Sequence, residues 1–144
     1  MVRVKFYDLY TIEDSKLKFA VIMSRFKDKW IFVKHKDRLT WEIPGGHREK
    51  NEDINFAASR ELKEETGAKE FNIIPICIYS VYKDGVESFE QLFYANITYL
   101  DKLPNYEISE INLFDTNPEN LTYPLIQPHL FKKGEEFYEK LIKD

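Results

Sequence analysis

The chain has 144 residues, of which 43% are hydrophobic and 32% are charged. That length and balance are typical of a single folded domain covering residues 1–144, and they differ from the composition of disordered chains. The formal net charge of −4 argues against a protein that neutralises the many phosphates of a long nucleic acid. A small nucleotide ligand stays compatible with that charge if a metal ion carries the positive charge.

The first third of the sequence predicts strands. Residues 1–10 alternate charged and apolar side chains, which favours a strand over a signal peptide. Residues 17–24 and 30–35 are apolar runs on either side of a short polar stretch, and this pattern is typical of a β-hairpin. No segment approaches the roughly 20 apolar residues that cross a bilayer, so no membrane association is expected.

A helix and a second hairpin follow in the chain. Residues 51–66 have helical periodicity, with Asn51 as the expected N-cap and Gly67 at the left-handed position after the helix. Residues 71–82 and 88–100 flank Asp84-Gly85, a pair that favours a tight hairpin turn. The run at 71–82 is apolar at nearly every position, which predicts a strand covered on both faces.

A second helix is predicted near the C-terminus, beginning around Pro128. Its apolar stripe comprises Leu130, Phe131, Phe137, Tyr138, Leu141 and Ile142. Strands combined with two helices that each need one face covered predict a layered α/β sandwich with a mixed sheet. Cys77 is the only cysteine, so no intrachain disulfide can form, and a buried thiol in a reducing cytoplasm is expected.

The helix at 51–66 carries acids on an unusual face. On a helical wheel Glu61, Glu64 and Glu65 continue the apolar stripe. The opposite face is taken by Asn55, Ser59, Lys63 and Thr66. A run of charges is more often a solvated face, but here that face is already occupied, so the glutamates are expected to point toward the sheet.

Three carboxylates in the last turns of a helix need a cation. Each acid there opposes the helix dipole at a cost of roughly 0.3 to 1 kcal/mol. Arg60 precedes Glu64 by four residues and can pair with it, but one arginine cannot neutralise three acids. Carboxylate oxygens favour a hard divalent ion, Mg²⁺ or Mn²⁺, over zinc.

The segment GHREKNEDINFAASRELKEETGA resembles the Nudix box. That pattern is Gly, five residues, Glu, seven residues, Arg-Glu, an aliphatic residue, any residue, Glu-Glu, any residue, Gly and an aliphatic residue. The matching positions are Gly46, Glu52, Arg60, Glu61, Leu62, Glu64, Glu65, Gly67 and Ala68. Only Ala68, which is smaller than the usual Leu, Ile or Val, departs from the pattern. A chance match would arise on the order of once per billion starting points.

The resemblance implies a fold and an activity. The preceding Trp41-Glu42-Ile43-Pro44-Gly45 also resembles the family's entry into the box, and the order of elements is similar to the family's α/β/α sandwich with a mixed β-sheet. The implied activity is Mg²⁺-dependent hydrolysis of the pyrophosphate bond of a nucleoside diphosphate-linked substrate. Mn²⁺ is expected to substitute for Mg²⁺.

The resemblance also implies roles for individual residues. Glu61, Glu64 and Glu65 would bind the metal together with the carbonyl of Gly45. Glu61 would act either as a ligand or as the carboxylate that deprotonates water. Arg60 would orient these carboxylates, and Glu52 would have a structural or outer metal role.

Some family members use a distant acid as general base. The candidates here are Glu90, Glu107 and Glu110, although an exposed loop acid is the commoner role for such a residue. We favour Glu107 because it precedes a short predicted strand at residues 111–114.

Basic residues that follow the predicted strands are candidates for holding the phosphates of the substrate. Lys34, His35 and Arg38 come after the run at 30–35, and His47 and Arg48 follow the glycine pair. For His47 a solvated loop position is the commoner role. Four residues could contact a base by stacking or hydrogen bonding, although aromatic residues in strands more often belong to the core: Tyr79, Phe93, Asn120 and Tyr123.

The resemblance constrains the identity of the substrate less than it constrains the reaction. Residues 30–46 are most similar to the MutT-like branch, which implies a nucleoside triphosphate, including 8-oxo-dGTP, that is converted into the monophosphate and pyrophosphate. Alternative substrates are an ADP-sugar or a dinucleoside polyphosphate. Tyr82 favours the latter, because it lies near the position at which dinucleoside polyphosphate hydrolases tend to carry a tyrosine. A non-catalytic binding module of the same fold is a third alternative, against which the intact acids argue. Monomer and homodimer both remain open.

Overall fold

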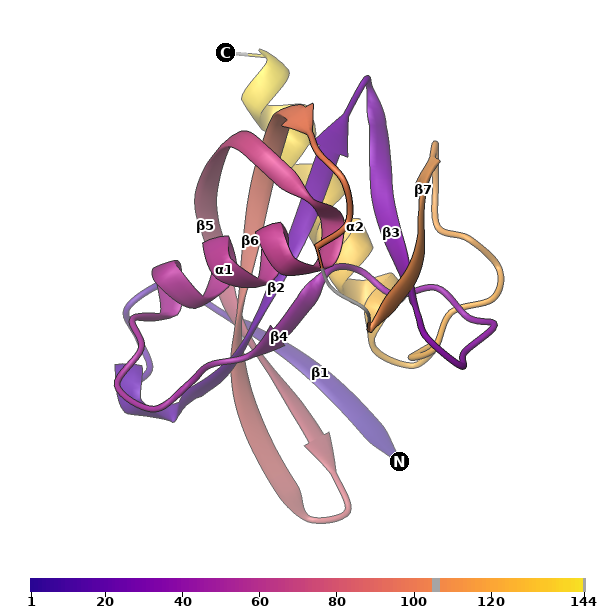
Figure 1. The fold of residues 1–144 in the computed structure, drawn as a ribbon. Helices are drawn as coiled ribbons and strands as arrows, with labels where there is room; N and C mark the ends of the chain where they lie inside the picture. The colour runs from indigo at the N-terminus through magenta and orange to yellow at the C-terminus, as the bar shows by residue number, and fades with distance from the viewer. Residues whose placement is uncertain (105–106, 144) are drawn as a thin grey trace.

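A mixed seven-stranded sheet lies between two helices in the computed structural model, which describes residues 1–104 and 107–143 (Figure 1). The strands are β1 (Val2–Tyr7), β2 (Leu17–Phe26), β3 (Lys29–His35), β4 (Gly45–His47), β5 (Ala68–Lys83), β6 (Val86–Leu100) and β7 (Ile108–Phe114). The helices are α1 (Ile54–Thr66) and α2 (Gln127–Lys143), and a 3-10 turn, η1, spans Asp14–Lys16. The strand order is β1-β5-β6-β2-β3-β7, with β4 paired to β2. The predicted α/β fold with a mixed sheet is confirmed.

Alternate residues of the central strands face the two helices. In β2, Ala20 and Ile22 belong to the core that includes Leu62 of α1. Val21 and Met23 belong instead to the core that includes Leu130 and Phe131 of α2. Because successive side chains of a strand point to opposite faces, a strand that is covered on both sides must be apolar almost throughout. The same applies to β5, in which 77–80 are all buried, as predicted for this run.

Both predicted hairpins are present. The turn residues Lys27, Asp28, Asp84 and Gly85 all have positive φ, between 51° and 79°, which is the backbone conformation of a tight two-residue hairpin turn. In the first hairpin β2 and β3 pair only beside the turn, and β4 then takes the place of β3 along β2. On its other side β2 pairs in parallel with β6. The glycine-rich strand β4 is therefore inserted into the sheet next to α1.

The N-cap of helix α1 lies two residues later than predicted. Asp53 is the N-cap, because its Oδ1 accepts hydrogen bonds from the backbone N–H of Asn55 at 2.8 Å and of Phe56 at 3.3 Å. The prediction of Asn51 is wrong, since Asn51 has a φ of 62° and an N-cap needs extended backbone.

The helix ends agree only in part with the predictions. Gly67 follows α1 with a φ of 78°, as predicted. Thr66, expected on the solvent face, is buried, and its Oγ1 donates to a backbone carbonyl one turn earlier. Leu141 and Ile142, expected on the buried stripe of α2, are exposed in its last turn, beyond the sheet (Figure 1). In the described part of the chain, no helix has the length and apolar character required to span a membrane.

Candidate active site

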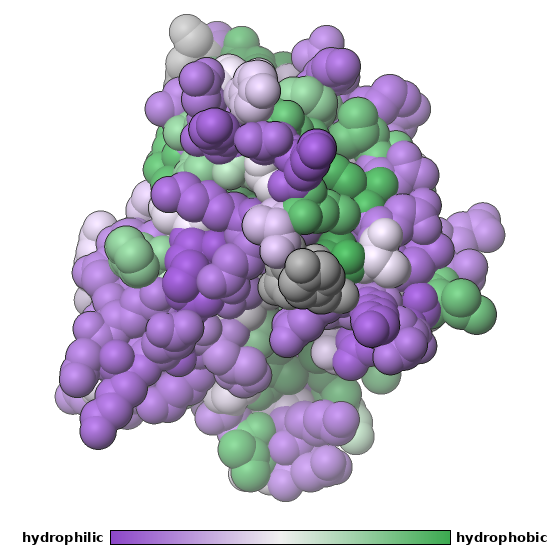
Figure 2. Space-filling view, in the orientation of Figure 1, coloured by the Kyte–Doolittle hydropathy of each residue, from purple (hydrophilic) through white to green (hydrophobic). Residues whose placement is uncertain are grey.

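A cavity of about 670 Å³ joins α1, the glycine strand β4 and the side of the sheet that α2 covers. From α1 it is lined by Arg60, Glu61, Glu64 and Glu65. From the sheet and the start of α2 its lining includes the apolar residues Val21, Val81, Ile126 and Leu130. The face over α1 and the loop before it is mainly hydrophilic (Figure 2). The cavity thus combines a cluster of acids with apolar lining residues.

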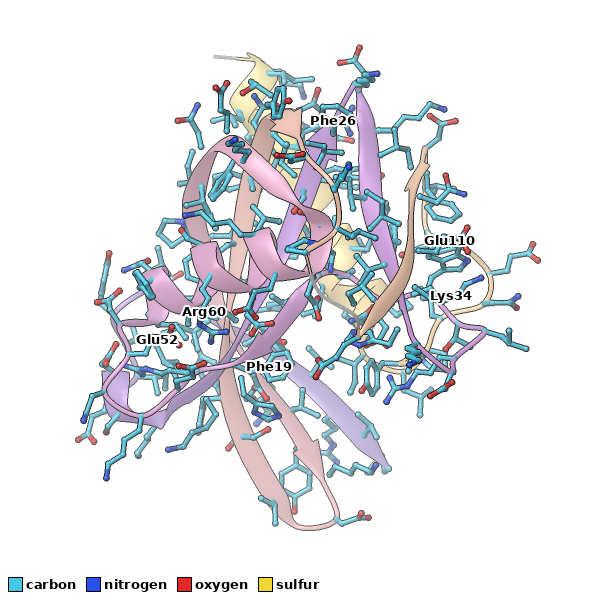
Figure 3. All side chains as sticks on the ribbon, in the orientation of Figure 1. Phe19, Phe26, Lys34, Glu52, Arg60 and Glu110 are labelled. Carbon is cyan, nitrogen blue, oxygen red and sulfur yellow. The ribbon has the colours of Figure 1, made fainter. Side chains whose placement is uncertain are left out.

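Arg60 holds several acids of this cluster. Its Nε and Nη2 donate to the two carboxylate oxygens of Glu52, at 2.6 and 2.9 Å, and the two side chains lie together beside α1 (Figure 3). Its Nη1 donates to Glu61 at 2.7 Å and to Glu64 at 3.3 Å, and Nη2 also donates to the carbonyl of His47 at 3.0 Å. The hydrogen bond from Arg60 lowers the pKa of Glu52. One guanidinium therefore fixes acids from the loop and from α1.

Glu61 lies against the backbone of β4. A Cβ atom on Gly46 would stand 2.0 Å from Glu61 Oε2, so only glycine leaves room for this carboxylate. The Glu61 side chain is only 13% exposed. Burial raises its pKa to about 7, against the lowering effect of the hydrogen bond from Arg60 and with a further increase from the negative charge of Glu65.

Glu65 is the most deeply buried of the three helix acids, with 7% of its side chain exposed. Its Oε1 accepts from the backbone N–H of Gly45 at 2.9 Å, and its Oε2 lies 3.2 Å from Nε2 of His35. Burial raises the pKa of Glu65, and the hydrogen bond to Glu65 raises the pKa of His35. His35 also lies 3.7 Å from Glu42, which accepts from Arg38 at 2.8 Å. Glu64, in contrast, has 43% of its side chain exposed.

The structure separates the three basic residues proposed for phosphate binding. His35 and Arg38 line the cavity. Lys34 lies 3.4 Å from Glu110 and over the ring of Trp41, beside β7 and apart from Arg60 (Figure 3). It is not among the described residues that line the cavity. Of the basic residues after the glycine pair, His47 lines the cavity.

Two of the three distant acids reach the cavity. Glu90 of β6 and Glu107, just before β7, line it, whereas Glu110 pairs with Lys34. The strand after Glu107 begins at Ile108, earlier than predicted.

Two of the four residues proposed to contact a base line the cavity, and two do not. Tyr79 and Tyr123 line the cavity. Phe93 lies in the core on the α1 side of the sheet, and Asn120 uses its backbone carbonyl to bind the N–H of Trp41.

Among the polar residues of the cavity wall that the sequence analysis does not identify, two are buried, Glu42 and Gln127. Gln127 Oε1 accepts from the backbone N–H of Ile43 at 2.9 Å. An acid inside the apolar run at 41–44 is a signal that points to Glu42, because a buried charge needs a partner. Nothing in the local sequence marks Gln127, which is placed by the start of α2.

The donor chemistry of the cluster fits a hard divalent cation. Glu61 is half-buried and Glu65 is buried, and their raised pKa values express the cost of ionising both carboxylates. Among the described residues, no three His, Cys, Asp or Glu side chains are arranged to hold an ion jointly. Glu61 and Glu64 are bonded to Arg60, and Glu65 lies against His35. All-oxygen donors suit Mg²⁺ or Mn²⁺.

The sequence of this chain is similar to those of known proteins. The NUDIX domain family model matches residues 14–120. The chain is 36% identical over 106 residues to YtkD of Bacillus subtilis (strain 168), provisionally named an 8-oxo-dGTP diphosphatase, covering 73% of this chain and 66% of that protein. A second protein of the same strain, with the same provisional name, is 33% identical over 54% of this chain and 51% of its own length. The chain therefore spans somewhat less than two thirds of the first relative and half of the second.

A solved structure is similar over nearly the whole chain. The Bacillus subtilis pyrophosphohydrolase BsRppH superposes with a TM-score of 0.76 and 29% identity, covering 94% of this chain and 90% of that one. The matched family segment contains β4, α1 and the acids that line the cavity. The chain belongs to the NUDIX domain family.

Proposed function

We propose that the chain is a Mg²⁺-dependent hydrolase that converts a nucleoside triphosphate, with 8-oxo-dGTP as the first candidate, into the monophosphate and pyrophosphate. The observation that carries the proposal is the cluster of Glu61, Glu64 and Glu65 in a cavity that is also lined by apolar residues of the sheet and of the start of α2. Such a cavity offers donors for a cation beside a surface for a base. The provisional names of the relatives favour the same substrate class.

The reaction consumes one water, which attacks phosphorus as the bridging P–O bond breaks, and it releases a proton. Bound Mg²⁺, or Mn²⁺ in its place, would stabilise charge on the phosphate oxygens and lower the pKa of a water. Glu61, Glu64 and Glu65 would hold the ion through carboxylate oxygens, with the carbonyl of Gly45. In the alternative role, Glu61 would instead accept the proton from water.

Cationic side chains have separate roles in this proposal. Arg60 keeps Glu61 and Glu64 beside β4 through its bonds to both carboxylates. His35 and Arg38, which line the cavity, would contact the phosphates. Lys34 has weaker support as a substrate contact, because Glu110 engages it outside the cavity.

The test is an assay of purified protein with nucleoside triphosphates, 8-oxo-dGTP, an ADP-sugar and a dinucleoside polyphosphate, with Mg²⁺, with Mn²⁺ and with a chelator. We expect metal-dependent release of pyrophosphate from triphosphates. Release of AMP from the ADP-sugar, or of nucleotides from the dinucleoside polyphosphate, with triphosphates left intact would assign the alternative substrates. Absence of turnover on every compound would favour a binding module.

A paired substitution tests the acids themselves. Glu64→Gln should reduce metal-dependent turnover by at least 100-fold while leaving the circular dichroism spectrum unchanged. Glu70→Gln, the same change at an exposed position of β5 outside the cavity, should retain full turnover. Unchanged turnover of the Glu64 variant would refute the assignment of this residue.

A further inference from the structure

Glu90 is a half-buried acid in the cavity wall that the proposed reaction does not use. It lies in β6, and its Oε1 accepts a hydrogen bond from Ser88 Oγ at 2.9 Å. Its Oε2 is buried and has no hydrogen-bond partner among the described residues. Leaving a buried acceptor unpaired costs free energy, so a ligand that supplies a donor would be bound more tightly.

Two aromatic residues flank Glu90 on the same face of the sheet. Glu90 pairs with Tyr79 of β5 on one side and with Phe19 of β2 on the other, and all three line the cavity. Side chains at paired positions of neighbouring strands project to the same face. A carboxylate between two rings combines a hydrogen-bond acceptor with surfaces on which a planar base can stack.

The place of Glu90 suits the base end of a nucleotide. Phe19 pairs also with His47 of β4, so β4 and β6 are two strand spacings apart, roughly 10 Å. The phosphate-cleaving acids lie beside β4, where Glu61 contacts Gly46. The base of a nucleotide whose phosphates lie at β4 would therefore reach the strand that carries Glu90.

The chemistry of a carboxylate selects among the bases. An ionised carboxylate only accepts hydrogen bonds, so its two oxygens match an edge that presents two adjacent N–H donors. Guanine has such an edge in N1–H and the 2-amino group, whereas adenine presents one donor and one acceptor. The terminal torsion of glutamate is soft, which lets the carboxylate turn toward the ligand while Ser88 stays bonded to it.

We propose that Glu90 is a specificity-determining residue that accepts hydrogen bonds from the N1–H and 2-amino groups of a guanine-type base, held between Phe19 and Tyr79. The inference rests on the proposed function, because it takes a nucleotide as the ligand. Burial raises the pKa of Glu90 to about 7, and donors from a base would favour its ionised form.

The test is calorimetric binding of GMP, IMP and AMP, which needs no turnover. The parent protein should bind GMP at least tenfold more tightly than AMP, with IMP between them because it lacks the 2-amino group; a two-bond base contact is worth about 5- to 150-fold. Glu90→Gln should reverse the preference, since an amide offers one donor and one acceptor and so matches adenine. Glu70→Gln, the exposed control in β5, should keep the parent ratio.

The outcomes separate the two proposals. An unchanged ratio of GMP to AMP affinity in Glu90→Gln, or binding of neither nucleotide by the parent protein, would overturn the role of Glu90. Equal loss of turnover on all triphosphates in this variant, with an unchanged binding ratio, would make Glu90 part of the chemical step and overturn it as well. Absence of metal-dependent cleavage in a parent protein that shows the expected binding ratios would count against the proposed function alone.

Discussion

Arg60 and Glu52 form a two-bond pair in which Nε donates to Oε2 at 2.6 Å and Nη2 donates to Oε1 at 2.9 Å. The two residues are eight positions apart, in α1 and in the loop before it. The pair ties that loop to the helix. Since the same guanidinium reaches Glu61 and Glu64, the position of the acids depends on a residue that is not itself a proposed metal ligand.

Glu52→Gln should therefore destabilise the fold and disturb the site. An amide can accept only one of the two bonds from Arg60, so we expect a loss of about 2 kcal/mol in the free energy of unfolding, measured with urea. Glu49→Gln is the matched control, because Glu49 is 69% exposed and lies 3.7 Å from Arg60; its effect should stay within about 0.5 kcal/mol. Equal effects of the two changes would contradict this role of the pair.

Gly46→Ala should displace the Glu61 carboxylate. The added Cβ would stand 2.0 Å from Oε2, so either β4 or the side chain must move, and we expect turnover to fall at least tenfold, as for a misplaced catalytic group. Gly46→Ala should also lower the stability measured by thermal unfolding. This loss should be smaller in a protein that carries Glu61→Ala, because the carboxylate that clashes with the new Cβ is then absent. Independent effects of the two substitutions would argue against this contact.

The stability of the protein should fall as Glu90 ionises. Burial raises its pKa from 4.5 to about 7, so between these values the native state holds a proton that the unfolded chain has released. The resulting stabilisation is complete below about pH 4.5 and is lost as the pH rises through 7. The stability of Glu90→Gln relative to the parent should rise by on the order of 2 kcal/mol from about pH 5 to 8. A difference that does not change with pH would contradict the raised pKa of this acid.

The N-cap of α1 can be tested by two substitutions at one position. Asp53→Ala removes the acceptor of the hydrogen bonds from Asn55 and Phe56 and should cost about 1 kcal/mol of unfolding free energy. Asp53→Asn keeps an acceptor oxygen and should cost much less. Equal losses in urea denaturation would show that charge at this position matters more than capping.

Patterns within a few residues determined much of the architecture. Asp84-Gly85 adopts the predicted turn because positive φ is a local preference of such a pair. Gly67 ends α1 for the same kind of reason. The helical wheel placed Glu61, Glu64 and Glu65 along the apolar stripe, since periodicity depends only on sequence spacing. The predicted N-cap, Asn51, is wrong because the loop gives Asn51 a positive φ and gives Asp53 the extended backbone of a cap.

Only the tertiary structure decided which distant residues meet these acids. The parallel pairing of β2 with β6 places Phe19 beside Glu90, although the two are far apart in the chain. The start of α2 adds Gln127 to the same cavity, and β7 holds Lys34 away from it through Glu110. Pairing between distant strands depends on how whole faces are buried rather than on the local residues. The sequence alone therefore predicted Glu61, Glu64 and Glu65 as the acids of the candidate site, and the packing of the sheet decided which residues face them.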